Sequence, residues 1–151
     1  MLRRLDDGHY PHQALTEAII GAAIEVHRAL GPGFLECVYE HAMIVELRAR
    51  GLQVTRQVEY PVLYRGQQVG KHVADLIVDG SVLVELKRVD DIHPIHRAQV
   101  ISSLRAANVD VGLLINFNVT RLKHGVVRLI NPRLLSVLCV PQCPNEAPID
   151  E

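Results

Sequence analysis

The stretch VADLIVDGSVLVELKRV, residues 73–89, decides the fold of this chain. Two runs of Val, Leu and Ile flank an Asp-Gly pair, a pattern typical of neighbouring strands joined by a tight turn. Three charged residues interrupt the apolar runs: Asp75, Glu85 and Lys87. A charge inside an apolar strand costs several kcal/mol unless it is paired or binds an ion, so this stretch is also the first candidate for a functional site.

The register of the turn decides which of these charges share a face. Strand alternation places Glu85 and Lys87 on one face. A two-residue turn formed by the Asp-Gly pair leaves Asp75 on the opposite face. A three-residue loop at positions 78–80 pairs Asp75 with Leu83 and brings all three charges together. A shared functional site requires this second register.

The remainder of the chain predicts helices around the strands. Apolar residues at three- and four-residue steps indicate helices on both sides of a Gly-Pro-Gly stop, and the second helix carries an apolar stripe of Leu35, Val38, Ala42 and Val45. We expect helices at 14–30, 34–50 and 94–107, and strands at 52–64, 69–78, 81–89 and 109–117, with a short strand at 126–130. This α-α-β-β-β-α-β order predicts one α/β domain with a mixed sheet flanked by helices.

Length and composition narrow the range of functions. The 151 residues suit a single domain, which we place at 1–131 with roughly the first 13 residues partly irregular. A net charge of −1 disfavours a general nucleic-acid coat, and 4% aromatic residues without Trp disfavour a base-stacking platform. Any nucleic-acid function must therefore lie in a local site.

The sequence gives no sign of export or of membrane insertion. No run reaches the ~20 apolar residues that span a bilayer, and the N-terminal segment lacks the apolar core of a signal peptide. We therefore expect a cytoplasmic protein with no membrane partner. The extension at 132–151 is Pro-rich and acidic and is expected to be disordered. Its cysteines, Cys139 and Cys143, lack the further ligands of a metal site.

Two carboxylates and a lysine on one face have a known chemical use. Carboxylate oxygens hold Mg²⁺ or Mn²⁺, the metal activates a water, and an ammonium group orients that water. The alternative is that Glu85 and Lys87 belong to the solvent face of an edge strand, with Asp75 a chance neighbour. The pattern alone leaves both open.

Longer motifs give the chain a family resemblance. The segments GFLECVY (33–39), VADLIVDGSVLVELK (73–87) and VGLLINF (111–117) resemble the PD-(D/E)xK nuclease superfamily. The first segment is similar to the motif of the bacterial GxxExxY family, through Gly33, Glu36 and Tyr39. The resemblance covers roughly residues 14–131 and implies a restriction-endonuclease-like core.

The resemblance implies roles for individual residues. Asp75 and Glu85 would be the metal-binding acids and Lys87 the catalytic lysine. The superfamily often adds an acidic ligand from the first core helix, which here matches Glu36, with Glu40 one turn later as the second candidate. The implied cofactor is Mg²⁺ or Mn²⁺, and the implied substrate is DNA or RNA.

Other side chains are weaker candidates for this site. Gln99 follows the ExK strand on a helix where many such nucleases place a glutamine toward the site, although a surface glutamine fits equally well. Tyr39 is expected to pack with a hydrogen-bonded hydroxyl. His93 and His96, near the predicted site, could contact phosphate or a metal, but solvent-exposed or helix-capping roles are favoured for both, which makes His96 at most an additional site residue. Basic residues that flank the site in the sequence could form a small rim that contacts phosphate, although scattered solvated charges would look the same: Arg65, Lys71, Arg88, Arg97 and Arg105.

The sequence thus predicts a Mg²⁺-dependent nuclease. Two alternatives use the same fold: a catalytically silent accessory subunit that binds nucleic acid or protein, and a small-molecule regulatory module. Because the chain has no basic surplus, we expect nucleic-acid binding to be weak or salt-sensitive unless a homodimer or an accessory protein adds contacts.

Overall fold

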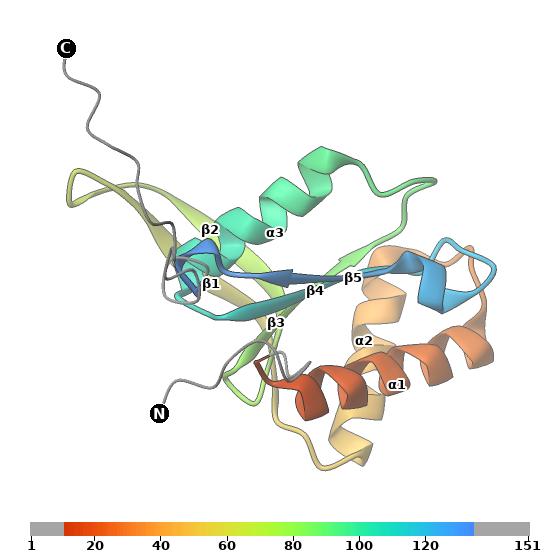
Figure 1. Ribbon diagram of the computed structural model, residues 1–151. Helices are drawn as coiled ribbons and strands as arrows, with labels where there is room; N and C mark the ends of the chain where they lie inside the picture. Colours follow the sequence, from red (N-terminus) through yellow and green to blue (C-terminus); the bar gives the residue numbers. More distant parts are fainter. Residues whose placement is uncertain (1–10, 135–151) are drawn as a thin grey trace, which may run out of the picture.

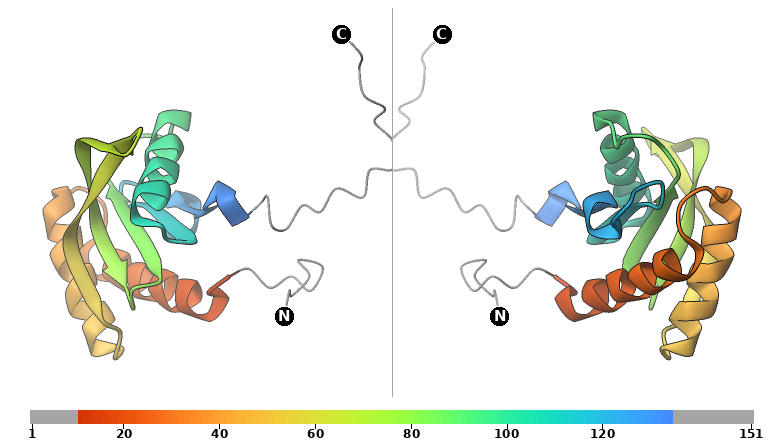
Figure 2. Two further views of the ribbon diagram at one scale, coloured as in Figure 1. Left: turned by 90° about the vertical axis from the view of Figure 1, so that its left-hand side faces the viewer. Right: turned by 90° about the vertical axis from the view of Figure 1, so that its right-hand side faces the viewer.

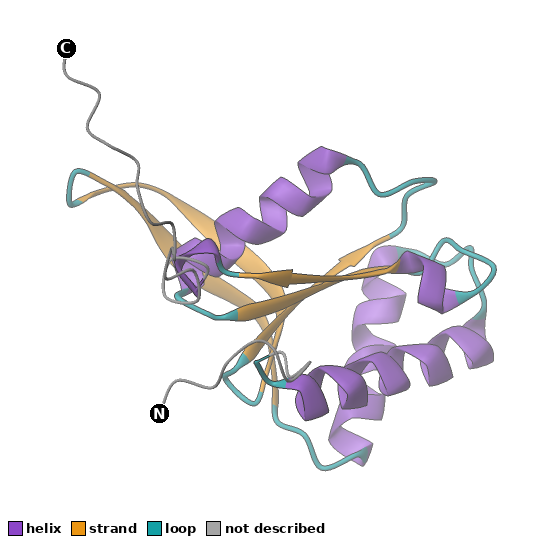
Figure 3. Cartoon of the chain, in the orientation of Figure 1, coloured by secondary structure: helices purple, strands orange, loops and turns teal. Residues whose placement is uncertain are grey.

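The computed structural model describes residues 11–134, and its elements follow the expected order (Figure 1). They are α1 (Gln13–Leu30), α2 (Glu36–Ala49), β1 (Val54–Tyr64), β2 (Gln67–Val78), β3 (Val82–Lys87), α3 (Pro94–Ala107), β4 (Val111–Asn116), a short 3-10 helix η2 (Leu122–Gly125) and β5 (Val126–Ile130). The expected α/β domain with a mixed sheet is therefore confirmed (Figure 3). The expected irregular N-terminus and the C-terminal extension, with Cys139 and Cys143, lie almost wholly outside the described residues.

The five strands form one sheet in the order β1-β2-β3-β4-β5. All neighbouring pairs are antiparallel except β3 and β4, which are parallel because α3 makes the crossover between them. β4 is buried along its whole length, as its unbroken apolar sequence predicts. The β1–β2 hairpin extends beyond the body of the domain (Figure 1).

Helices cover both faces of the sheet (Figure 2). The helices α1 and α2 pack on one face through a core that includes Ile19, Met43 and Leu47. On the other face, α3 buries Val100 and Leu104 against the strands. In the part of the chain that the structure describes, no helix is long and apolar enough to cross a membrane.

The buried stripe of α2 differs from the expected one. Leu35 precedes the helix and is exposed, and Val45 is 70% exposed. The helix instead packs through Tyr39, Met43 and Leu47, with the carboxylate of Glu40 on the same buried side. Of the expected stripe, Ala42 does pack against the core, but the larger side chains of Tyr39 and Met43 fill more of it.

The β2–β3 turn confirms the shared face but not the expected register. Val78 pairs with Val82, so the three-residue loop comprises residues 79–81 and not 78–80. Asp79 and Gly80 both have positive φ angles, and the Ser81 N–H donates to the Val78 carbonyl. This shift of one residue in each strand preserves the alternation, so Asp75 lies on the same face as Glu85.

Tyr39 fixes the segment that joins α1 to α2. Its ring is 1% exposed and stacks on Phe117 with 4.4 Å between ring centroids. Its hydroxyl donates to the Gly31 carbonyl at 2.6 Å and accepts the Phe34 N–H at 3.2 Å. The tyrosine of the GxxExxY motif therefore closes the Gly-Pro-Gly connection, which places the start of α2.

Substitution Tyr39→Phe keeps the stacked ring and removes both hydrogen bonds. We expect it to lower the free energy of unfolding by about 1–3 kcal/mol, because two partly buried backbone groups lose their partner. Urea denaturation measures this loss. The control is Tyr64→Phe at the exposed hairpin tip, which should change stability by less than ~0.5 kcal/mol; equal effects at both positions would refute the assignment.

Candidate functional site

The site forms where β2 separates from β3. The two strands pair only from Leu76 to Val78, whereas β2 stays paired with β1 well beyond this point. At the separation, the Leu86 N–H of β3 donates to Asp75 Oδ2 at 2.9 Å. The Asp75 carboxylate thus replaces the backbone carbonyl that would accept this hydrogen bond if the two strands stayed paired. Its side chain lies between the diverging strands.

Glu85 follows directly on β3 and carries the most perturbed carboxyl group of the described residues. Its side chain is buried among apolar strands, and its Oε1 has no hydrogen-bond partner there. Burial, the nearby negative charge of Asp75 and a hydrogen bond with Asp75 raise the pKa of Glu85 to about 8, against the opposing effect of Lys87. The positive charge of Lys87 therefore does not offset the burial of this acid and its like-charged neighbour.

Lys87 ends β3, and Asn116 ends the parallel neighbour β4 directly beside it. Asn116 is 1% exposed; its amide donates to the Val89 carbonyl at 2.8 Å, and its Oδ1 accepts the Val89 N–H at 3.1 Å. These bonds hold the chain as it leaves β3. Asn116 was not among the predicted residues, because a polar residue at a strand end has no distinctive sequence signal.

The two α2 glutamates occupy different environments. Glu36, in the first turn, is exposed but close enough to the other charges that partial burial, and then the charge of Asp75, raise its pKa, while Lys87 opposes the rise. Glu40 is 6% exposed and accepts hydrogen bonds from Arg56 and Gln57, each at 2.8 Å. Glu36 therefore remains open to a ligand, whereas both oxygens of Glu40 are occupied.

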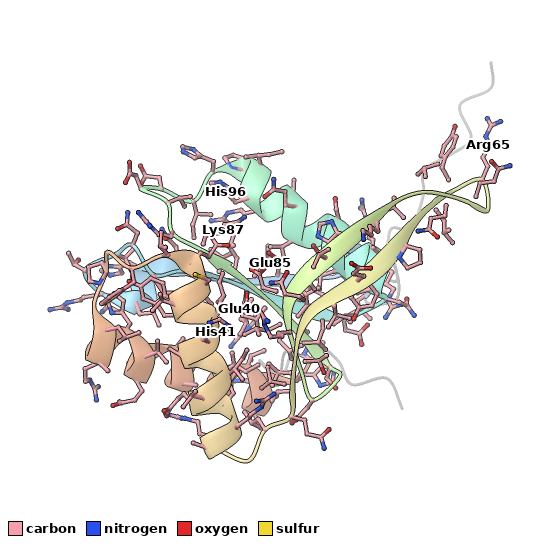
Figure 4. The ribbon with its side chains drawn as sticks, turned by 180° about the vertical axis from the view of Figure 1, so that it is seen from behind. Glu40, His41, Arg65, Glu85, Lys87 and His96 are labelled. Atoms are coloured by element: carbon pink, nitrogen blue, oxygen red, sulfur yellow. The ribbon has the colours of Figure 1, made fainter. Side chains whose placement is uncertain are left out.

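Figure 4 shows Glu85 and Lys87 extending from β3 into the region between α2 and α3. His96 is the third residue of α3 and closes its capping box: its Nδ1 accepts the His93 N–H at 2.9 Å, which leaves Nε2 as the proton carrier of the neutral ring. The structure thus shows the helix-capping alternative for this histidine pair. Arg65 lies far off at the hairpin tip, and Lys71 pairs with Glu59.

Gln99 is exposed on α3, and its side chain makes no hydrogen bond with any residue from 11 to 134. Its carbonyl accepts the Ser103 hydroxyl, and Ser103 in turn contacts the His72 ring of β2. Of the predicted residues, Asp75, Glu85, Lys87 and Glu36 come together, whereas the Gln99 side chain makes no hydrogen bond with any of them.

The oxygens gathered here suit a hard divalent cation. Among the described residues, no group of three or more Asp, Glu, His or Cys side chains forms a ready metal cage. The adjacent Asp75 and Glu85 carboxyls nevertheless leave a buried oxygen without a partner and raise the pKa of Glu85, which is the deficit that a bound cation corrects. The chemistry of these residues therefore fits a hard divalent cation.

Comparison with known proteins gives a family. The sequence model of the family described as "PD-(D/E)XK nuclease superfamily" matches residues 13–129, which is most of the chain. No curated protein sequence matches. Among solved structures, one titled "Crystal structure of SSO0001" superposes with a TM-score of 0.52 at 17% identity, over 84% of this chain and 63% of that one. This likeness extends to the fold alone, and the chain spans less than two thirds of that structure.

The raised pKa of Glu85 predicts a pH-dependent stability. Between pH ~4.5 and ~8 the unfolded chain ionises this group before the folded protein does, so its contribution to folding falls as pH rises. Glu85→Gln removes the ionisation. The free energy of unfolding that the metal-free protein gains from this substitution should therefore be larger at pH 8 than at pH 4.5, by an amount on the order of 2–3 kcal/mol.

Urea denaturation in EDTA at the two pH values measures this difference. The matched control is Glu59→Gln at an exposed position of β1, where the gain should not grow with pH. A Glu85→Gln variant whose relative stability is the same at both pH values would show that the carboxyl is not buried as an unpaired acid.

Proposed function

This chain belongs to the PD-(D/E)XK nuclease superfamily, and on that premise we propose that it is an active, metal-dependent nuclease that hydrolyses phosphodiester bonds in DNA or RNA. Within the superfamily we propose a place in the GxxExxY family, supported by Gly33, Glu36 and Tyr39 at the spacing of that motif. The nuclease-like domain is the premise; cleavage and metal dependence are the proposal.

One observation carries it: the unpartnered, buried Oε1 of Glu85 beside Asp75, with Lys87 two residues along the same strand. A buried carboxyl oxygen without a hydrogen-bond partner is costly, and the Asp75 carboxyl, which also hydrogen-bonds Glu85, adds a like charge beside it and not a cation. Sites that perturb acids in this way are concentrated where proteins bind ions or carry out chemistry.

The side chains divide the work by position. Asp75 and Glu85 would hold the cation, which when bound would activate a water and neutralise the charge that develops on the phosphate. Glu36, at the open side, would add a ligand directly or through water. The Lys87 ammonium, which pairs with no carboxylate of the described chain, would donate to the attacking water and hold it in line with the scissile bond.

Substrate binding must rely on local contacts. The net charge of −1 gives no general attraction to phosphates, and the basic residues expected as a rim are spread from the hairpin tip to α3. A homodimer or an accessory protein that extends the contact surface would therefore raise affinity. If the chain proves unable to cleave but still binds nucleic acid, the accessory-subunit role replaces the enzyme.

Asp75→Asn and Lys87→Ala test the catalytic assignment. In assays on single- and double-stranded DNA and RNA with Mg²⁺ or Mn²⁺, each should lower cleavage by a factor of about 10² or more, through loss of metal and loss of the water's donor respectively. Both variants should unfold cooperatively, as circular dichroism would show.

Asp79→Asn is the matched control. It makes the same chemical change four residues away, keeps the oxygen that accepts the Gln53 N–H at 2.8 Å, and suits the positive φ of that turn. Its cleavage rate should equal that of the parent. Cleavage that survives Asp75→Asn, or a parent protein that cleaves none of the substrates with either metal, would contradict the proposal.

A further inference from the structure

Gln57 has a backbone conformation that its place in a strand does not explain. It lies inside β1 with a φ of 49°, a left-handed value that residues other than Gly, Asn and Asp rarely adopt. The ladder to β2 pairs Arg56 with Leu76 and Val58 with Ala74, and skips the pair between them, Gln57 and Asp75. The distortion therefore lies directly across from the acid at which the sheet opens.

The side chain of Gln57 shows what the distortion achieves. Its amide nitrogen donates to Glu40 Oε2 at 2.8 Å and makes a longer contact to Asp75 Oδ1 at 3.4 Å. The other oxygen of Glu40 accepts the Arg56 Nε–H at 2.8 Å. A buried glutamate on α2 thus anchors an amide from β1, and that amide reaches the carboxylate on β2.

Asp75 is consequently held from two sides. Its Oδ1 faces the Gln57 amide and its Oδ2 accepts the Leu86 N–H. Two donors on different oxygens fix the plane of a carboxylate, leaving its remaining lone pairs directed elsewhere. We propose that Gln57 is a positioning residue, which with Glu40 as its anchor orients the Asp75 carboxylate for the metal ion; this inference rests on the proposed function.

The chemistry of an amide suits this position. One NH₂ group supplies two donors, so it can bridge two acids without adding a charge that would repel a cation. Asparagine would accept the left-handed φ more readily but is one methylene shorter than glutamine. Local strain at a residue that touches a functional carboxylate is a common sign of such a role.

The test measures Mn²⁺ binding by the full chain, from the free-ion signal in electron paramagnetic resonance, with no substrate present. Gln57→Ala should weaken Mn²⁺ binding by about tenfold, as loss of a group that orients a metal ligand usually does. Cleavage at saturating Mn²⁺ should return to within about threefold of the parent rate. Gln68→Ala is the matched control, with the same change at an exposed position of the same hairpin, and should bind as the parent does.

Gln57→Gly separates positioning from stability. Glycine removes the amide and also relieves the left-handed strain, so this variant should have a higher thermal midpoint than Gln57→Ala while binding Mn²⁺ just as weakly. A role limited to folding would instead let Mn²⁺ affinity recover along with stability.

The outcomes distinguish the two proposals. Parent protein that binds no more Mn²⁺ than Asp75→Asn overturns the metal site and this inference with it. Parent protein that binds Mn²⁺ while Gln57→Ala binds equally well overturns the inference alone. A Gln57→Ala variant whose cleavage stays low at saturating Mn²⁺, or whose affinity recovers in Gln57→Gly, also overturns it, because either result marks a structural residue.

Discussion

The bond from the Leu86 N–H to the Asp75 carboxylate is the interaction on which the site depends. Strands in a sheet normally pair through their backbones. Where one strand separates from its neighbour, backbone N–H and C=O groups in the interior lose their partners. Here a side-chain oxygen satisfies the amide that β2 no longer reaches. The sheet can therefore open without an orphaned N–H, and the opening brings Asp75 beside Glu85. One hydrogen bond therefore supports both the local structure of the sheet and the arrangement of the acids in the proposed site.

The sequence predicted the architecture and the acid pair more reliably than their surroundings. Strand alternation was enough to group Asp75 with Glu85 and Lys87. The predicted loop began one residue too early, but this error left the two faces of the sheet unchanged because both strands shifted together. Helix periodicity placed α2 but predicted only part of its buried stripe, so the burial of Glu40 was missed. The left-handed Gln57 could not be foreseen, because its conformation arises from tertiary contacts and not from local propensity.

The acid pair makes the metal-free domain less stable than its apolar core would allow. A carboxyl with a pKa of about 8 is mostly protonated near neutral pH in the folded chain but ionised in the unfolded chain, so its proton uptake costs stability on folding, and Lys87 only partly offsets this cost. A bound cation would supply at one point the positive charge that a chain of net charge −1 lacks overall. The acid pair that lowers the stability of the metal-free protein is then the same pair that serves the proposed function, and many functional sites reduce stability in this way.

The network behind the acids shows how such a site is kept from collapsing. If Arg56 reached Asp75 directly, a permanent cation would neutralise the acid and compete with a metal ion. The arginine instead satisfies Glu40, which is almost fully buried, and only the neutral amide of Gln57 extends to Asp75. Contacts between α2, β1 and β2 thereby orient the Asp75 carboxylate without placing a positive charge beside it. This separation requires the amide at position 57, and the strained φ of Gln57 places it there.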